Sequence, residues 1–106
     1  MYLIGVRNVF ESLPNTKKEV FEKIVEKGCV RIERIVSNGD SSEEGFFYDQ
    51  DEYEFVLLMQ GNATLFFESE GYVELKRGDY LIIEPHKKHR VESTSKDAIW
   101  LCVFYR

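Results

Sequence analysis

Hydrophobic and polar residues alternate at two different periods along this chain of 106 residues. The segment 15–28 places four apolar residues on one face of a helix: Val20, Phe21, Ile24 and Val25. Thr16 stands three residues before Glu19, the spacing of a capping box at a helix start. Gly28 stands where a helix commonly ends in a left-handed residue. The pattern therefore predicts one short N-terminal helix.

After Gly28 the period changes to two, which is typical of antiparallel strands. Turn-forming clusters separate the strands that this alternation predicts: 29–37, 52–61, 63–70, 72–76, 80–84 and 97–106. The nearly adjacent pair of strands over residues 52–70 is expected to form a hairpin. Seven or eight short strands with turns between them predict a mainly β fold, either a sandwich or a barrel.

Several predicted strands are apolar on both faces, and residues 54–59 contain almost nothing polar. A strand that buries both faces needs a second layer over its outer side. One short helix cannot cover a sheet of this size, so we expect a second copy of the chain to supply that layer. The pattern thus predicts a homodimer.

Length and charge narrow the class of protein. The length fits one domain over residues 1–106, with an N-terminal arm and helix in 1–28 and the strands in 29–106. A net charge of −5 argues against nucleic-acid binding. The first apolar run ends at Arg7 after five residues, too short for a signal peptide or a membrane span. We therefore expect a cytoplasmic protein with no membrane partner.

The motifs around two glycines resemble those of the cupin superfamily, and the resemblance covers residues 45–106. Cupins carry the motifs G-x5-HxH-x3,4-E-x6-G and G-x5-P-x-G-x2-H-x3-N. Glu54 and Gly61 match the end of the first motif, and Gly78 starts the second. His89 occupies the histidine position of the second motif, whereas His86 stands where a turn glycine is expected. The resemblance implies a jelly-roll β-barrel with a site in its interior.

The HxH pair of the first motif is missing from this chain. Its two positions fall on Tyr48 and Gln50 or, with the longer spacer, on Phe47 and Asp49. The resemblance still implies a divalent metal such as Mn, Fe, Ni or Zn. The residues that it places as candidate ligands are His89, Glu54, Gln50 and Asp49. One imidazole with several oxygen donors suits manganese or iron(II).

Alternation predicts what surrounds the motif residues. If Glu54 faces the interior, Val56 and Leu58 do too, which gives an acidic mouth above an apolar floor suited to a small organic ligand. Arg34 is expected among inward positions, either as an anchor for a carboxylate or phosphate or as a salt-bridge partner of Glu54 or another interior acid. Tyr48 is a candidate proton donor or ligand contact, with aromatic packing as the alternative.

Two classes of function remain open from the sequence. In the first, the chain is a small-molecule enzyme of dioxygenase, isomerase or decarboxylase type on a small carboxylate or sugar-like substrate. Its catalytic residues would be Glu54, His89 and Tyr48, and Arg34, Gln50 and His86 would contact the ligand. Without a metal, Glu54 and His89 could act as an acid–base pair. In the second, the chain is a non-catalytic ligand-binding or dimeric structural cupin.

Overall fold

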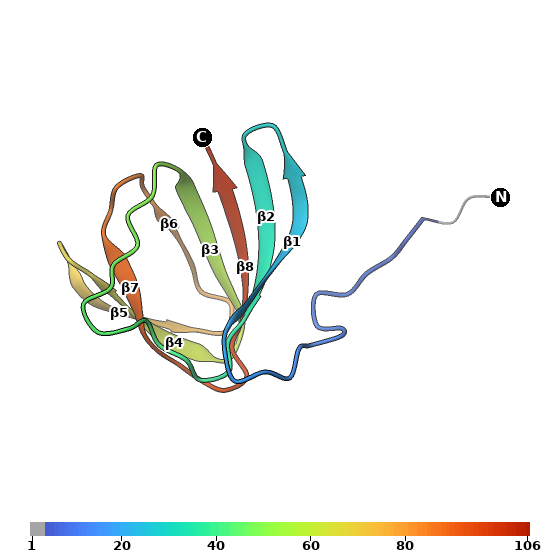
Figure 1. Cartoon of the computed structure of the whole chain (residues 1–106), viewed down its shortest axis with the longest axis horizontal. Helices are drawn as coiled ribbons and strands as arrows, with labels where there is room; N and C mark the ends of the chain where they lie inside the picture. Colours follow the sequence, from blue (N-terminus) through green and yellow to red (C-terminus); the bar gives the residue numbers. More distant parts are fainter. Residues whose placement is uncertain (1–3) are drawn as a thin grey trace.

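The computed structural model describes residues 4–106 and contains eight strands in two sheets (Figure 1). The strands are β1 Val20–Lys27, β2 Val30–Val36, β3 Tyr53–Gln60, β4 Asn62–Phe67, β5 Gly71–Lys76, β6 Tyr80–Ile83, β7 His89–Thr94 and β8 Ile99–Tyr105. The larger sheet has the order β1-β2-β8-β3-β6, and the smaller has the order β5-β4-β7. All the strand pairs are antiparallel. The prediction of a mainly β fold is therefore confirmed.

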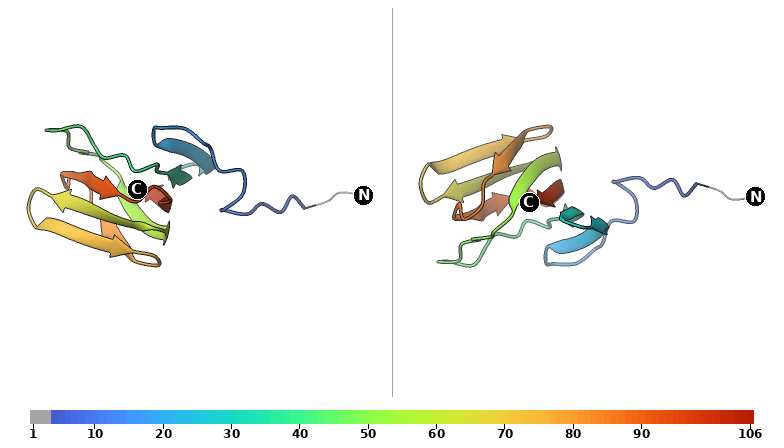
Figure 2. Two further views of the ribbon diagram at one scale, coloured as in Figure 1. Left: turned by 90° about the horizontal axis from the view of Figure 1, so that it is seen from below. Right: turned by 90° about the horizontal axis from the view of Figure 1, so that it is seen from above.

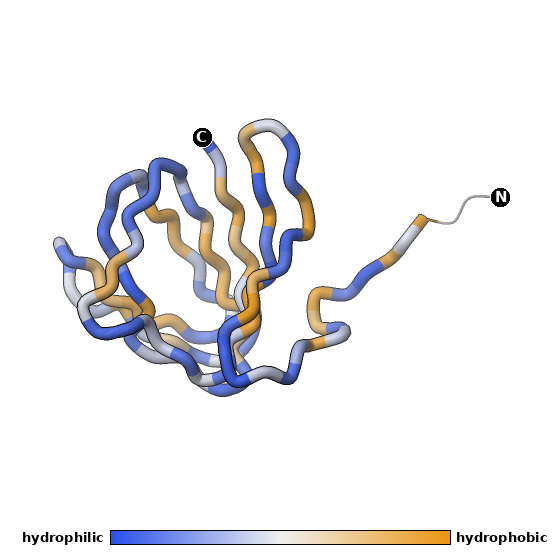
Figure 3. The backbone as a smooth tube through the Cα atoms, viewed as in Figure 1, coloured by the Kyte–Doolittle hydropathy of each residue, from blue (hydrophilic) through white to orange (hydrophobic). Residues whose placement is uncertain are grey.

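The core lies between the inner faces of the two sheets. It is built from buried side chains of both: Ile35, Val56, Leu58, Ala63, Leu65, Phe67, Leu75, Ile83, Ala98, Trp100, Cys102 and Phe104. Figure 3 shows hydrophobic residues along the strands and hydrophilic residues in most of the connecting turns. The two sheets do not join edge to edge, so the expected closed barrel is wrong and the fold is an open β-sandwich.

The helix expected before Gly28 is wrong, because residues 20–27 form strand β1. Residues 4–106 contain no helix. A register shift between Lys23 and Val25 inserts an extra residue into β1, and this bulge lets a strand carry apolar residues at helix-like spacing. Gly28 has φ of +58°, but it serves the two-residue turn that joins β1 to β2. The strands, which were expected to begin at residue 29, therefore begin at Val20.

The hairpin expected over residues 52–70 is also wrong, since β3 and β4 belong to different sheets. Gly61 is the single residue between them and has φ of +85°. A Cβ atom at this position would lie 2.3 Å from Ser95 Oγ and 2.9 Å from Ala98 Cα. A glycine is thus needed where the chain crosses sharply from one sheet to the other. The hairpin partner of β4 is β5.

The outer face of the larger sheet, which points away from the smaller sheet, carries an apolar row across all five strands. The row consists of residues paired through successive strands: Val25, Ile32, Val103, Phe55 and Ile82. Its two ends are the most open, with Val25 44% and Ile82 48% exposed. The sequence pattern predicts that a second copy of the chain covers an apolar face of this kind.

Residues 4–19 form an N-terminal arm without strand or helix. Figures 1 and 2 show that the part of this arm nearest residue 4 extends away from the two sheets. Its side chains Ile4 and Val6 are 90% and 88% exposed. Within residues 4–106 no helix is long and apolar enough to span a membrane.

Candidate functional site

A cavity lies between the two sheets and is lined from both. Its apolar lining consists of Phe21, Ile35, Val56, Leu65, Ile83, Val91, Trp100 and Phe104. Its polar lining consists of Glu19, Tyr48, Gln50, Glu54, His89 and Cys102. The volume is about 70 Å³, whereas one water needs roughly 10–15 Å³. This interior cavity can therefore hold a molecule the size of several waters, and a few polar groups converge on it.

Glu54 and His89 face each other across the interior cavity. Glu54 lies on β3 and is 8% exposed, and His89 begins β7 and is 5% exposed. The inward position of Glu54, on the same face as the buried Val56 and Leu58, agrees with the alternation in the sequence. His89 Nε2 lies 4.0 Å from Glu54 Oε1, which is too long for a hydrogen bond but leaves room for a ligand atom to contact both.

The hydrogen bond on the other side of the ring sets the tautomer of His89. Its Nδ1 lies 2.8 Å from the carbonyl oxygen of Lys87. A carbonyl oxygen only accepts hydrogen bonds, so Nδ1 carries the proton in the neutral ring. Nε2, which faces Glu54, is then the atom that can accept a proton or a hydrogen bond.

Burial shifts both groups toward their uncharged forms. Desolvation raises the pKa of Glu54, against the opposing effect of hydrogen bonds with Gln50 and Cys102. Desolvation also lowers the pKa of His89, against the hydrogen bond to Lys87. A carboxyl with a raised pKa and an imidazole with a lowered pKa that face one cavity form a pair suited to proton transfer.

Tyr48 and Gln50 reach the interior cavity from the loop before β3. The backbone of Tyr48 pairs with that of His89, so this loop extends the smaller sheet beside β7. The Tyr48 ring stacks on the His89 ring at a centroid distance of 5.4 Å. Burial raises the pKa of the Tyr48 phenol. Gln50 Nε2 donates a hydrogen bond of 2.8 Å to Glu54 Oε1.

His86 and Asp49, two further candidates from the sequence, do not line the interior cavity. His86 Nδ1 lies 2.8 Å from Asp49 Oδ1 at the surface, and the His86 side chain is largely exposed. The backbone N–H of His86 donates to the carbonyl oxygen of Gln50 at 2.7 Å. His86 has φ of +62°, which explains why it occupies the position of a turn glycine. The pair therefore holds the loop that carries Gln50 and does not meet a ligand in the cavity.

Arg34 was expected to face inward, but the structure places it on the outer face of the larger sheet. Both oxygens of the Glu22 carboxylate accept hydrogen bonds of 2.8 Å from its Nη2. Its Nη1 donates to the carbonyl oxygens of Val9 and Glu11 in the N-terminal arm. Arg34 therefore anchors the arm and is neither a partner of Glu54 nor a contact for a ligand in the interior cavity.

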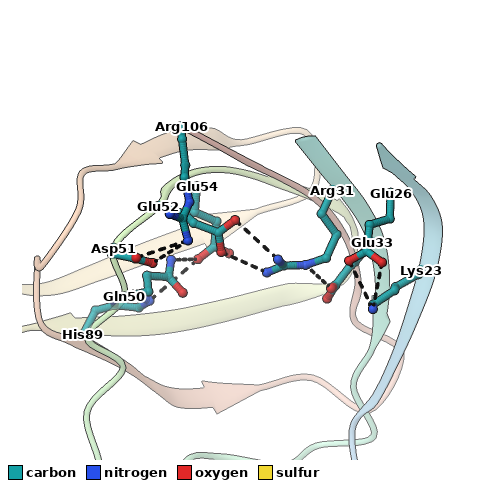
Figure 4. A network of polar contacts seen from close by, with 10 residues as sticks. All are labelled: Lys23, Glu26, Arg31, Glu33, Gln50, Asp51, Glu52, Glu54, His89 and Arg106. Carbon is teal, nitrogen blue, oxygen red and sulfur yellow. Dashed lines mark hydrogen bonds and ion pairs between the residues drawn. The ribbon is translucent and has the colours of Figure 1, made fainter. Parts of the chain in front are cut away.

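A second arginine, Arg31, lies on the inner side of β2 near the cavity (Figure 4). Its guanidinium is bound by two carboxylates, Glu33 at 2.6 Å and Glu52 at 3.3 Å. The same group lies 4.2 Å from the centroid of the Phe104 ring. Its charge is therefore already balanced within the chain.

The candidate metal ligands only partly converge. Glu54, His89 and Gln50 meet, but Asp49 points away toward His86. Gln50 presents its nitrogen, not its oxygen, to the carboxylate. Residues 4–106 hold no group of three or more His, Cys, Asp or Glu side chains placed to bind a metal ion. This donor set does not fit the divalent metal site that the cupin motifs implied.

Two polar residues of the interior cavity were not among the candidates from the sequence. Cys102 is buried beside Glu54, and burial together with that carboxyl raises the pKa of its thiol. Glu19 was assigned to the expected helix and therefore could not be placed in a cavity. In the structure it directly precedes β1, and its carboxylate accepts a hydrogen bond of 2.8 Å from Ser37 Oγ. Glu19 could have been found only by interpreting residues 20–27 as a strand.

Comparison with known proteins gives consistent matches. A family model described as a cupin domain matches residues 33–104. A provisionally assigned mannose-6-phosphate isomerase from Ralstonia eutropha JMP134 is 32% identical with a TM-score of 0.91, covering 96% of this chain and 98% of that chain. A cupin superfamily protein from Desulfitobacterium hafniense DCB-2 is 19% identical with a TM-score of 0.75, covering 97% and 94%. An RmlC-like cupin family protein from Methanocaldococcus jannaschii is 22% identical with a TM-score of 0.69, covering 95% and 91%. No curated protein matches the chain.

Proposed function

This chain belongs to the cupin domain family, whose model matches residues 33–104, and on this premise we propose that its interior cavity binds a small organic molecule and exchanges a proton with it. The observation that carries the proposal is the Glu54–His89 pair. Both side chains are buried and face the cavity, with Glu54 Oε1 and His89 Nε2 4.0 Å apart. A ligand between the sheets would meet an acid and a base at once.

The proposed chemistry is acid–base exchange of the isomerase type. His89 Nε2, as the proton acceptor, removes a proton from a carbon next to a carbonyl group of the ligand. Glu54 donates its proton to that carbonyl oxygen, so an enol forms and the two side chains become oppositely charged. Their attraction across a few ångströms stabilises this state. His89 then returns its proton to the same carbon or to the former carbonyl carbon. At the same time Glu54 takes a proton from the enol hydroxyl or from a hydroxyl on the neighbouring carbon, so that a carbonyl forms again and the pair is restored.

Two further facts favour this chemistry over the other types expected for a cupin. The proposed steps use only side chains that line the cavity, those of Glu54 and His89. The Ralstonia eutropha protein, which is 32% identical over nearly the whole chain, carries the name of an isomerase. The alternative is a cavity that binds the same molecule without changing it.

Deuterium exchange tests the proposal without knowledge of the final product. Glyceraldehyde, dihydroxyacetone and a hexose are incubated with the protein in D₂O, and NMR follows the loss of the C–H proton next to the carbonyl. We expect exchange above the buffer rate. We also expect Glu54→Gln and His89→Gln to lower it by about 100-fold or more, the usual contribution of a positioned acid or base.

Matched variants distinguish the pair from its surroundings. Glu68→Gln changes an exposed glutamate that directly follows β4 of the smaller sheet. His86→Gln changes the other histidine of the chain. Both should keep the exchange rate. Binding without exchange, lost in Glu54→Gln, would show a binding protein and contradict the catalytic part. Absence of any thermal shift with these ligands at millimolar concentration would contradict the proposal as a whole.

A further inference from the structure

The interior cavity is lined by a second glutamate, Glu19. The backbone N–H of Glu19 donates to the Asp40 carboxylate at 2.7 Å, and Ser37 Oγ donates to Glu19 Oε2 at 2.8 Å. Ser37 Oγ in turn accepts a hydrogen bond of 3.1 Å from Trp100 Nε1. These contacts fix a partly buried carboxyl on the cavity wall.

The two carboxyls belong to one site. Both Glu19 and Glu54 line the cavity, and each raises the pKa of Tyr48, which lies on the same wall. His89 supplies the independent sign of a ligand, because it is 5% exposed and its Nε2 is 4.0 Å from the nearest carboxylate partner. A molecule in the cavity can therefore make polar contacts at Glu19 and again at Glu54 and His89.

No positive side chain lines this cavity within residues 4–106, since its lining includes neither lysine nor arginine. Arg34 points to the outer face and binds Glu22 and the arm. Arg31 is held by Glu33 and Glu52. A buried phosphate or carboxylate needs a paired cation or a dense set of donors, and here it would meet carboxyl groups instead.

We infer that the cavity selects a ligand without negative charge, with hydroxyl or similar hydrogen-bonding groups at two ends, one for Glu19 and one for the Glu54–His89 pair. This inference rests on the proposed function, because it assumes that the interior cavity is the ligand site. It identifies Glu19 as a second binding residue and excludes phosphorylated sugars and sugar acids as ligands. Arg34, which the sequence suggested as an anchor for an anion, does not line this cavity, and the carboxyl groups that do line it disfavour an anion.

A series of four hexose derivatives tests the selection by charge. The neutral hexose, its 6-phosphate, its uronate and its 2-amino form share one ring and differ in charge. Binding is measured by ligand-detected NMR and by thermal shift. We expect the neutral or the amino form to bind at least about ten times more tightly than either anion. Glu19→Gln should weaken this discrimination, because it replaces an ionisable carboxyl on the cavity wall by a neutral amide.

Glu26→Gln is the matched control for Glu19→Gln, since Glu26 is exposed on β1 and does not line the cavity. It should leave the ratio between neutral and anionic ligands unchanged. Tighter binding of the phosphate or uronate, lost in Glu54→Gln, would overturn this inference and leave the proposed function standing. An unchanged ratio in Glu19→Gln would also overturn it. If no derivative binds, or if Glu54→Gln has no effect on binding, the proposed function fails and this inference fails with it.

Discussion

Ser37 is fully buried and connects the core to the candidate site. Its Oγ accepts the hydrogen bond of Trp100 Nε1 and donates one to Glu19. In Ser37→Ala the Glu19 carboxyl can bind water, because it borders the cavity. Trp100 is 3% exposed, and its N–H loses the hydrogen bond that Ser37 accepts. A buried donor left without an acceptor costs about 1–3 kcal/mol. We expect this loss in the free energy of unfolding, a large part of the 5–15 kcal/mol that is typical of a domain.

Urea denaturation followed by circular dichroism measures the effect. A second variant, Trp100→Phe, removes the indole N–H. Trp100 is the one tryptophan of the chain, so this variant cannot be followed by tryptophan fluorescence. In the double variant the unpaired N–H is absent, so the cost of Ser37→Ala should shrink. We expect a coupling free energy of about 0.5–3 kcal/mol.

The control is Ser93→Ala, which changes an exposed serine on β7. Its free energy of unfolding should stay within about 0.5 kcal/mol of that of the unchanged protein. If Ser37→Ala also falls within that range, or if the costs of Ser37→Ala and Trp100→Phe simply add, the Trp100–Ser37–Glu19 connection does not stabilise the fold and the reasoning is refuted.

Three other predictions concern charge, backbone and assembly. Burial raises the pKa of Glu54 above its ordinary 4.5. Between the pKa of the unfolded chain and the higher pKa of the folded protein, the folded protein keeps a proton that the unfolded chain releases. Stability therefore falls as the pH rises through this range. Glu54→Gln should show a smaller fall in urea titrations at several pH values, and an equal fall in both proteins would contradict burial of Glu54 as a cause. Gly61→Ala should destabilise by about 1–3 kcal/mol more than Gly71→Ala, since both have positive φ but only Gly61 would clash with its neighbours; equal losses in urea denaturation would disprove the contact. We expect the chain to form a homodimer through its outer face, so light scattering should give twice the chain mass, reduced by Ile82→Glu but not by Tyr72→Glu on the smaller sheet. A monomeric unchanged protein would contradict this assembly.

Period-two alternation located most strands because a strand with one buried face repeats its apolar residues every second position. It placed β3 well enough to put Glu54, Val56 and Leu58 on one inner face, where the structure has them. The spacing of the second cupin motif likewise singled out His89 against His86, and the structure buries the first and exposes the second. These features are local, so a single sequence contains them.

The errors arose where a distant segment decides the local structure. Residues 20–27 have helix-like apolar spacing, but they extend along β2, and the bulge after Lys23 preserves the pairing. Gly28 adopts a positive φ in either interpretation, as a helix end or as a turn residue, so it could not discriminate between them. The pairing of residues 20–27 with β2 decides that they form a strand, and a short sequence window around residue 24 does not include β2. Glu19 was lost from the candidate site for the same reason.

The misplacement of Arg34 has a different cause, and it bears on function. In β2 the residues Val30, Ile32 and Val36 suggest a core face, but they lie on the outer face with Arg34, whereas the inner face carries Arg31 and Glu33. Alternation shows that two faces differ, but not which of them is inside. Here the inner face carries the Arg31–Glu33 ion pair, and Ile35 is the residue of β2 that lines the cavity, whereas the more apolar face is outside. An apolar outer face is what a second chain would cover. This strand therefore supports the dimer prediction.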